Sequence, residues 1–439
     1  MGYRLLLAVP FLVGIAVLQG LTVEIDTFHG SDARVYQLPT ILQLSDRLDL
    51  SDYPSAQTPL FHLVMAGWGE LVGFELWKLR LLNVAISYGA ALALLRLLRR
   101  ATPLDELPAF ALTLAFVLSP YVFGASFTLL TDNLAILFGL LALERIHAYA
   151  REGSPGAFAL ACLAIAGAVL TRQSFVWLVP VAAFFLVLPP VRLGRVAAGG
   201  ALLALSLVPL AALAIEWNGL VPPSADPASC GLCTDRPGVG RDALTLRTVG
   251  FTVALLGMYA AALLGPGLWR RFRRLRTPAA RAAGTALNAV GRRPGLPLAL
   301  LAGAAGLGVV LLLVSPLEFK PAAPGVQGDA GYLWRVSDEL PVVLGSSLAF
   351  WLLVPSGAVA AALLVRRAGW TALGSVYLGA FLLGVLPVNL VYQKYFDPFM
   401  LLAVALLARP PDFRGRWDYL GVVAVCVASV AYAISFAAR

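Results

Sequence analysis

Acidic residues gather in the first polar stretch of the chain, directly after an apolar run at residues 3–22. This stretch begins VEIDTFHGSD and contains Glu24, Asp26, His29 and Asp32. A carboxylate at the edge of a membrane is partly desolvated, which raises its proton affinity and suits it to act as a general base. We expect Asp26 to be that base, with Glu24 and Asp32 as further catalytic candidates. The alternative is that the first two carboxylates only cap the end of a span.

A second set of polar side chains lies at the ends of later apolar runs. Asp132 falls early in one run, Arg172 and Gln173 follow another, and Lys394 and Tyr395 follow a third. An ionisable side chain inside a span is costly and is by default a functional candidate. Cations at this depth suit a lipid phosphate, and carboxylates suit sugar hydroxyls. In the alternative, Asp132 bonds a neighbouring helix end and the cations only extend to the interface.

The composition is that of a membrane protein. Of 439 residues, 59% are hydrophobic and 13% are charged, and the mean hydropathy is +0.82. Soluble domains average about 45–50% apolar and about 25% charged residues. These values exclude a soluble globular enzyme and a disordered chain. The net charge of +9 is divided among short arginine clusters between apolar runs, and this pattern argues against nucleic-acid binding.

The apolar runs predict an all-α polytopic membrane protein with about thirteen transmembrane helices in a single integral domain, 1–439. The first run lacks a small-residue cleavage site, so we interpret it as a retained helix. The predicted spans are 3–22, 78–98, 107–123, 126–148, 155–171, 174–191, 196–216, 249–269, 296–316, 341–365, 370–391, 397–409 and 418–437.

Arginine clusters follow every second span and set the predicted orientation. Examples are Arg99 and Arg100 after the second span and Arg366 and Arg367 after the tenth. Cytoplasmic loops are enriched in such residues. The N-terminus and these loops are therefore predicted to be cytoplasmic, and the candidate residues above lie at the outer membrane level.

Three outer loops are substantial: 23–77, 217–248 and 317–340. The first is predicted to be helical, because Leu38–Leu50 has helical spacing of apolar residues and Thr58-Pro59 precedes a second semi-apolar segment. The second loop contains Cys230 and Cys233 as a CxxC, for which a disulfide and free thiols are both open. The few nearby ligands argue against zinc, and no metal or other cofactor is predicted.

Several short motifs resemble the GT-C superfamily, whose members use polyprenyl-phosphate sugars and carry an acidic residue just after the first span. Within it the chain is most similar to the α-1,2-glucosyltransferases that add the last glucose to the dolichol-linked oligosaccharide. The motifs that match, in order, are Asp26-Thr27-Phe28-His29, the alanine of Asp32-Ala33-Arg34, Thr58-Pro59, Arg80-Leu81-Leu82-Asn83, Pro120 with Phe127, Thr131-Asp132, Arg172-Gln173-Ser174 and Lys394-Tyr395.

This resemblance implies catalytic roles for Asp26, Glu24 and Asp32. It implies substrate binding by a wider set: His29, Arg80, Asp132, Arg172, Gln173, Lys394 and Tyr395. The sequence departs from the family's pattern at three places: Asp replaces Glu at 26, Gln is absent around 32, and Lys replaces Arg at 394. The Arg-rich, Lys-poor composition favours a bacterial source, in which the carrier would be undecaprenyl or decaprenyl phosphate.

The leading hypothesis is an inverting hexosyltransferase in the plasma membrane, with its active site facing outward. Its donor would be a polyprenyl-phosphate hexose and its acceptor a glycan or glycolipid. A transporter or flippase of lipid-linked glycans is the alternative, although it predicts charges at mid-membrane depth. An O-antigen ligase or polymerase is a third, but such enzymes usually rely on a large later outer loop.

Overall fold

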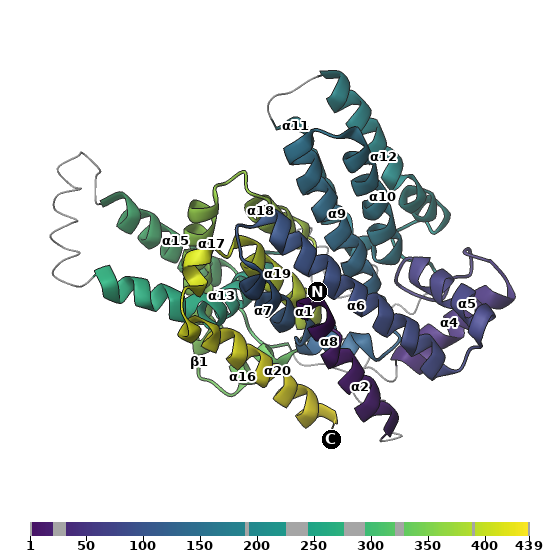
Figure 1. The fold of residues 1–439 in the computed structure, drawn as a ribbon, viewed down its shortest axis with the longest axis horizontal. Helices are drawn as coiled ribbons and strands as arrows, with labels where there is room; N and C mark the ends of the chain where they lie inside the picture. The colour runs from purple at the N-terminus through teal and green to yellow at the C-terminus, as the bar shows by residue number, and fades with distance from the viewer. Residues whose placement is uncertain are drawn as a thin grey trace. The chain divides into compact units, whose positions relative to one another are not determined.

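A computed structural model gives the fold as a ribbon in Figure 1 and describes residues 2–20, 32–188, 193–224, 245–275, 295–320, 329–388 and 391–437. The all-α prediction is confirmed, because helices dominate these ranges and the strands are one two-residue hairpin, β1 (Val342–Val343) with β2 (Ser346–Ser347). The chain divides into two compact units. The first contains Met1–Ala101, Phe116–Gly240 and Ala428–Arg439, and the second contains Thr102–Ala115 and Arg241–Val427.

The first unit contains the N-terminal helices and an α-helical bundle. Its elements are α1 (Gly2–Leu6), α2 (Val9–Gly20), the π-helix η1 (Asp32–Gln37), α4 (Leu38–Asp46), α5 (Leu60–Val72), α6 (Leu76–Ala101), α8 (Pro120–Ser126), α9 (Asp132–Glu152), α10 (Pro155–Thr171), the 3-10 helix η2 (Gln173–Trp177), α11 (Leu178–Val187) and α12 (Leu193–Glu216). In Figure 1, α9, α10 and α12 run side by side, and α10 packs on both neighbours.

The second unit is centred on two long helices, α13 and α17. Its elements are α13 (Leu246–Leu275), α15 (Gly295–Val314), α16 (Tyr332–Asp338), the β hairpin, α17 (Leu348–Ala368), α18 (Leu373–Gly384), α19 (Asp397–Leu407) and the 3-10 helices η3 (Gln393–Tyr395), η4 (Pro410–Phe413) and η5 (Arg416–Tyr419). Two helices are divided between the units: α7 (Glu106–Val117) and α20 (Leu420–Ala437). Gly257 and Gly357 lie where α13 crosses α17, and a Cβ at Gly257 would lie 2.6 Å from the Leu353 carbonyl oxygen. Small residues of this kind let membrane helices approach closely.

The protein is an integral multi-pass membrane protein. Within the described ranges, five helices are long and apolar enough to cross a bilayer: Leu76–Ala101, Asp132–Glu152, Leu193–Glu216, Leu246–Gly267 and Leu348–Ala368. Taking α7 and α8 as one broken span gives a sixth, and further apolar helices of 10–17 residues are present. The predicted number of thirteen is therefore not confirmed.

One predicted boundary is wrong in a way that affects the candidate site. The span predicted at 126–148 begins instead at Asp132, since 120–126 forms the separate helix α8. Pro120 is at the start of α8 and has no amide hydrogen to continue a preceding helix, which accounts for the break after α7. Asp132 is thus in the first turn of α9 rather than inside it, where the positive end of the helix dipole favours a carboxylate.

Two of the arginine clusters from which the orientation was predicted also bind buried carboxylates. Glu144 of α9 accepts a 2.7 Å hydrogen bond from Arg96 Nε of α6 and a second bond from Arg100. Asp412 accepts two bonds from Arg367, at 2.7 and 2.8 Å. Each carboxylate is almost fully buried, so each requires the opposite charge beside it.

Candidate active site

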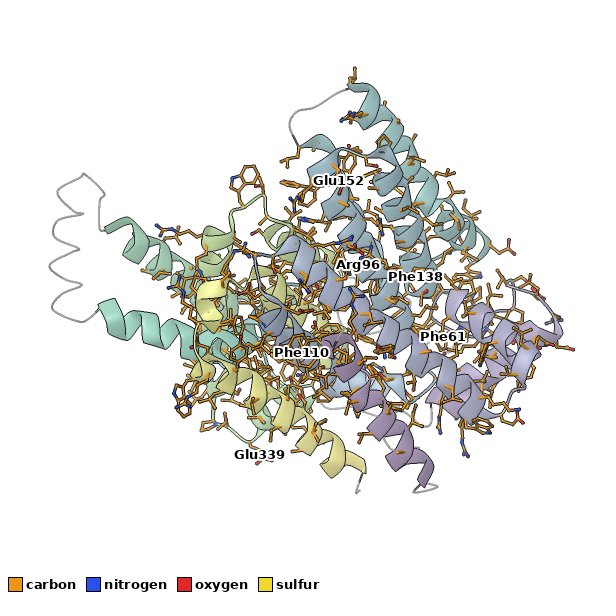
Figure 2. The ribbon with its side chains drawn as sticks, in the orientation of Figure 1. Phe61, Arg96, Phe110, Phe138, Glu152 and Glu339 are labelled. Carbon is orange, nitrogen blue, oxygen red and sulfur yellow. The ribbon has the colours of Figure 1, made fainter. Side chains whose placement is uncertain are left out.

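The described part of the predicted first outer loop (23–77) is folded onto the bundle of the first unit. Its helices η1, α4 and α5 and the segment between α4 and α5 contribute to a core that also includes residues from α6, the α8–α9 connection, α9 and the residue after α12. The members of this core are Ala33, Ile41, Leu44, Tyr53, Phe61, Met65, Ala66, Leu79, Ile86, Leu129, Leu134 and Trp217. Figure 2 labels Phe61 on α5 within this region. The predicted helical loop is therefore a packed layer and not a solvated excursion.

A fully buried histidine connects three segments of this layer. His62 Nε2 lies 2.6 Å from Gln37 Oε1, and His62 Nδ1 lies 2.5 Å from the Tyr53 hydroxyl oxygen. Because the amide oxygen only accepts, Nε2 carries the proton and Nδ1 accepts from Tyr53. Burial lowers the pKa of His62 to about 3 and raises the pKa of Tyr53 well above its usual value. Both groups are therefore neutral, and their network joins η1, α5 and the segment between α4 and α5.

Further hydrogen bonds fix the loop to the helix ends beside it. Thr58 Oγ1 donates to the Val169 carbonyl oxygen of α10 at 2.7 Å. Gln173 Nε2 donates to the Ala56 carbonyl oxygen at 2.7 Å, and Trp217 Nε1 donates to the Leu50 carbonyl oxygen at 2.8 Å. The Thr-Pro and Arg-Gln motifs, more than 100 residues apart in sequence, thus meet at one edge of the first unit.

Asp132 and Arg172 form an ion pair at this edge. Asp132 is at the start of α9 and Arg172 directly follows α10. The two helices are antiparallel neighbours, so the start of one lies beside the end of the other. The Arg172 side chain is 9% exposed and the Asp132 side chain 22% exposed. The pair is therefore partly shielded from water, and a substrate anion at Arg172 would also meet the Asp132 charge.

Two asparagines hold the segment that leads into Asp132. Asn83 of α6 donates to the carbonyl oxygens of Ala125 and Thr128, at 2.6 and 2.5 Å. Asn133 donates to Ser87 Oγ of α6 at 2.7 Å and to Ser126 Oγ at 3.1 Å. These bonds fix α8 and its connection to α9 against α6. The half-buried Arg80 lies one turn before Asn83 on α6.

In the second unit, Lys394 and Tyr395 lie on η3, immediately before α19. Lys394 Nζ is 5.2 Å from the centroid of the Tyr395 ring and 5.7 Å from that of Tyr392. An ammonium group at such distances is attracted by the electrons of the ring face. The cation predicted to bind substrate therefore lies against two aromatic rings.

A buried carboxylate anchors this short helix. Asp397 accepts hydrogen bonds from Tyr259 and Tyr332, at 2.6 and 2.7 Å, and from Gln393 Nε2 at 3.0 Å. Gln393 Oε1 accepts from the amide of Leu333 at 2.9 Å. Burial and the nearby Asp397 charge raise the pKa of Tyr332 well above its usual value. The donors around Asp397 fix the backbone on which Lys394 lies.

A second ion pair fixes the third outer loop to α13. Arg247 NH1 donates to Asp329 Oδ1 at 3.0 Å, and Arg247 NH2 donates to the Glu318 carbonyl oxygen at 2.6 Å. The Asp329 carboxylate also accepts from the amide of Lys320 at 2.8 Å. The Arg247 guanidinium carbon lies 5.1 Å from the centroid of the Trp334 ring. This pair was not predicted from the sequence, where the only signal was an arginine two residues before the span predicted at 249–269.

The predicted catalytic residues are not tested by these contacts. Glu24, Asp26 and His29 lie outside the described residues, as do Cys230 and Cys233; Asp32 begins η1, but its side chain is likewise not described. The structure does bring together three of the predicted substrate-binding residues: Asp132, Arg172 and Gln173. Within the described ranges, no three His, Cys, Asp or Glu side chains gather closely enough to hold a metal ion.

Comparisons with known proteins concern part of the chain. Residues 56–217 match the model of a family described as dolichyl-phosphate-mannose-protein mannosyltransferase. No curated protein matches. A solved structure, ArnT from Cupriavidus metallidurans in the apo state, shares 16% sequence identity, with 84% of this chain and 72% of that chain covered and a TM-score of 0.38. The family match supports the GT-C resemblance over the residues it covers, and the terminal glucosyltransferase family is not confirmed.

Proposed function

We propose that the protein is an inverting glycosyltransferase of the GT-C type that transfers a hexose from a polyprenyl-phosphate sugar to a glycan or glycolipid acceptor on the extracytoplasmic side. The observation that carries the proposal is the family match over residues 56–217. That range contains the Asp132–Arg172 pair and Gln173, whose amide bonds the first outer loop. A partly shielded cation at the membrane edge suits the phosphate of a lipid-linked donor.

In the proposed reaction, the acceptor hydroxyl attacks the anomeric carbon of the donor. Asp26 takes the hydroxyl proton, the new glycosidic bond forms, and the bond between the anomeric carbon and the phosphate oxygen breaks. The electron pair leaves with the lipid phosphate, which needs no proton at neutral pH. A single base is therefore sufficient, in contrast to glycosidases that use two opposed carboxyl groups. Glu24 and Asp32 remain the next candidates for the base.

Arg172 would stabilise the negative charge that develops on the departing phosphate. In the structure its guanidinium is held by Asp132, which we propose to be a positioning residue that keeps the cation aimed and moderates its charge. Gln173, His29, Arg80, Lys394 and Tyr395 remain proposed substrate-binding residues. The scheme requires no metal ion.

A transfer assay tests this proposal. Purified full-length protein in detergent is given labelled polyprenyl-phosphate hexoses, with nucleotide sugars as comparison and a native lipid extract as acceptor, with and without EDTA. We expect label to move from one polyprenyl-phosphate hexose to a glycan regardless of EDTA. Transbilayer movement of an intact lipid-linked glycan in vesicles, with no new glycosidic bond, would instead favour the transporter.

The base is tested in the same assay by Asp26→Asn, which should lower the transfer rate by about 10²–10⁴ because general-base catalysis contributes that much. Asp46→Asn is the matched control, since Asp46 is an exposed carboxylate of the same loop. An Asp26→Asn protein that is expressed normally and transfers at the rate of the control would remove Asp26 from this role.

A further inference from the structure

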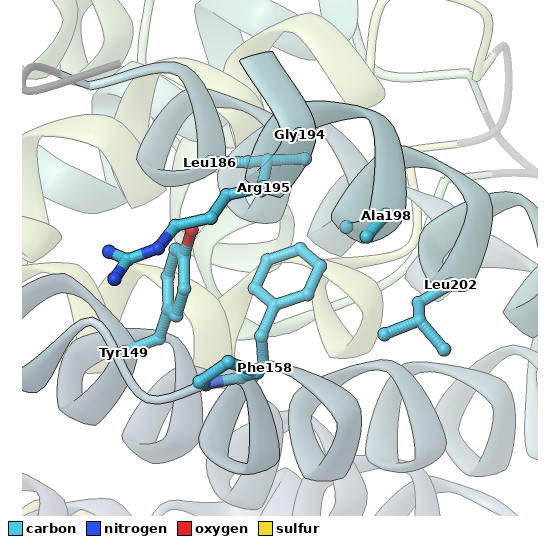
Figure 3. Close-up of a pocket in the computed structure, with 9 residues that line it drawn as sticks. Tyr149, Phe158, Leu186, Gly194, Arg195, Ala198 and Leu202 are labelled. Carbon is cyan, nitrogen blue, oxygen red and sulfur yellow. The ribbon is translucent and has the colours of Figure 1, made fainter. Parts of the chain in front are cut away.

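A pocket of about 160 Å³ lies in the first unit, near the opposite ends of α9 and α10 from the Asp132–Arg172 pair. It is formed where the end of α9 and the start of α10 meet α11 and the first turns of α12. Figure 3 shows its labelled residues. The arginine clusters of the sequence predict that this end of the helices faces the cytoplasm. The pocket is therefore separate from the proposed active site.

One end of the pocket is polar. Arg195 and Tyr149 lie side by side there, and the guanidinium extends past the tyrosine ring (Figure 3). A Cβ on Gly153 would lie 3.1 Å from Arg195 NH1, so the guanidinium rests against the turn between α9 and α10. Arg195 is exposed and forms no ion pair with any residue that the structure describes. A cation is thus presented at the pocket's mouth beside a phenol hydroxyl.

The rest of the pocket lining is apolar. Phe158 of α10 lies against the Tyr149 ring, with centroids 4.8 Å apart, and Leu202 of α12 lies away from Arg195 (Figure 3). Arg195, Ala198 and Leu202 are spaced by three and four residues, so they share one face of α12. This face changes from cation to small residue to leucine over two turns. Such an arrangement matches a ligand with an anionic head and an apolar tail.

The same helix, α12, also carries exposed apolar side chains that would contact lipid. Leu205, Val208 and Ile215 of α12 are exposed large hydrophobic side chains. In a membrane such side chains contact acyl chains, since lipid replaces water around the span. The pocket therefore adjoins a lipid-facing surface, and an acyl chain can enter it without crossing the helix bundle.

We propose that this pocket binds an anionic glycerophospholipid of the cytoplasmic leaflet. Its phosphate would bind the Arg195 guanidinium and the Tyr149 hydroxyl, and part of one acyl chain would lie over Phe158. Charge complementarity supports this occupant, because the cytoplasmic leaflet is rich in anionic lipids and basic pockets between helices on that side bind their head groups. The inference does not depend on the proposed glycosyl transfer.

Native mass spectrometry of the purified full-length protein tests the proposal. The added lipids are phosphatidylglycerol, phosphatidylcholine with the same acyl chains, and undecaprenyl phosphate. We expect phosphatidylglycerol to bind in preference to phosphatidylcholine, and Arg195→Gln to lower its occupancy at least fivefold. Arg414→Gln is the matched control, since Arg414 is an exposed arginine of another predicted cytoplasmic loop, and it should leave the occupancy unchanged.

A second variant tests the apolar end independently. Ala198→Phe fills the pocket but keeps Arg195, and it should also lower phosphatidylglycerol occupancy at an unchanged Tm. Equal phosphatidylglycerol occupancy in Arg195→Gln and Arg414→Gln would overturn the proposal. The proposal would also be overturned if Arg195→Gln lowered the occupancy of undecaprenyl phosphate but not that of phosphatidylglycerol. The pocket would then be a site for the carrier lipid.

Discussion

The two units hold their predicted substrate-binding cations in different ways. In the first unit, Arg172 is paired with the carboxylate of Asp132. In the second, Lys394 lies against the rings of Tyr392 and Tyr395, and the buried carboxylate of Asp397 accepts hydrogen bonds from Tyr259, Tyr332 and Gln393. The Arg172 guanidinium thus contacts an opposite charge, and the Lys394 ammonium contacts aromatic faces.

The difference has a chemical consequence. A guanidinium held by a carboxylate has a fixed direction, but its field is partly neutralised by its partner. The attraction of an ammonium to aromatic rings comes from its positive charge and does not require a planar fork. We therefore expect Arg172 to depend on geometry and Lys394 to depend on charge.

The largest effect is expected at the ion pair. Arg172→Gln should lower the transfer rate by about 10³, because it removes a donor to the developing charge and leaves the Asp132 carboxylate without this partner. Arg172→Lys should recover little, since lysine lacks the planar fork that fits a carboxylate. The measurement is the transfer rate of folded protein, with Arg414→Gln as control. A rate within threefold of wild type for Arg172→Gln would contradict the role.

A comparable ion pair in the second unit should affect stability more than chemistry. In Asp329→Asn, the loss of one partner of the buried Arg247–Asp329 pair should lower the free energy of unfolding by about 3 kcal/mol. Thermal unfolding in detergent measures this as a Tm lower by several degrees. Asp338→Asn is the control, because Asp338 is exposed in the same outer loop. Equal Tm values for the two variants would show that the pair does not stabilise the loop.

The aromatic-held cation should show the reverse pattern to Arg172. Lys394→Gln should lower the transfer rate by about 10², and Lys394→Arg should restore most of it, because a guanidinium keeps the charge and also stacks on tyrosine. Lys320→Gln, at an exposed lysine of the third outer loop, serves as control. If Lys394→Arg lowered the transfer rate as much as Lys394→Gln, positive charge would not be the property on which the role of Lys394 depends.

At neutral pH the neutral histidine network of the first loop has no effect to measure, and its contribution changes only as the pH is lowered. His62 has a folded-state pKa of about 3 against 6.5 for an ordinary histidine. The unfolded chain therefore binds a proton that the folded chain does not. The stability from this group is complete above pH 6.5 and falls as the pH is lowered toward 3, by at most about 1.4 kcal/mol per pH unit.

Tm measured between pH 7 and pH 4 checks this direction. Wild type should lose more Tm over that interval than His62→Gln, which cannot take up the proton. Parallel pH profiles for the two proteins would mean that the histidine is protonated in the folded chain as readily as in the unfolded one.

Much of the fold could be predicted from apolar runs alone. The run at 155–171 corresponds to α10 (Pro155–Thr171), and the run at 196–216 falls within α12 (Leu193–Glu216). The helical nature of the first outer loop was also predicted from spacing. The break between α7 and α8 was missed, because hydropathy does not register a proline that interrupts backbone hydrogen bonding in a continuous apolar run.

The candidate site likewise contains residues that the sequence predicted and residues that it did not. Asp132, Arg172 and Gln173 were selected because polar side chains at the ends of apolar runs are conspicuous. His62, Gln37 and the Arg247–Asp329 pair were not selected as site residues, since their partners lie 25 and 82 residues away in sequence. No local spacing rule connects residues at such separations.

The sequence by itself determined that this chain is a helical membrane protein and which polar side chains lie at the ends of its helices, because hydropathy and charge act locally along the chain. Only the tertiary structure decided which of those side chains meet. Pairing Asp132 with Arg172 requires α9 and α10 to pack antiparallel. The contact of Lys394 with the tyrosine rings depends on the position of η3, which the hydrogen bond from Gln393 to Asp397 helps to fix. Both contacts depend on packing between elements that are distant in sequence, and no local pattern of residues specifies such packing.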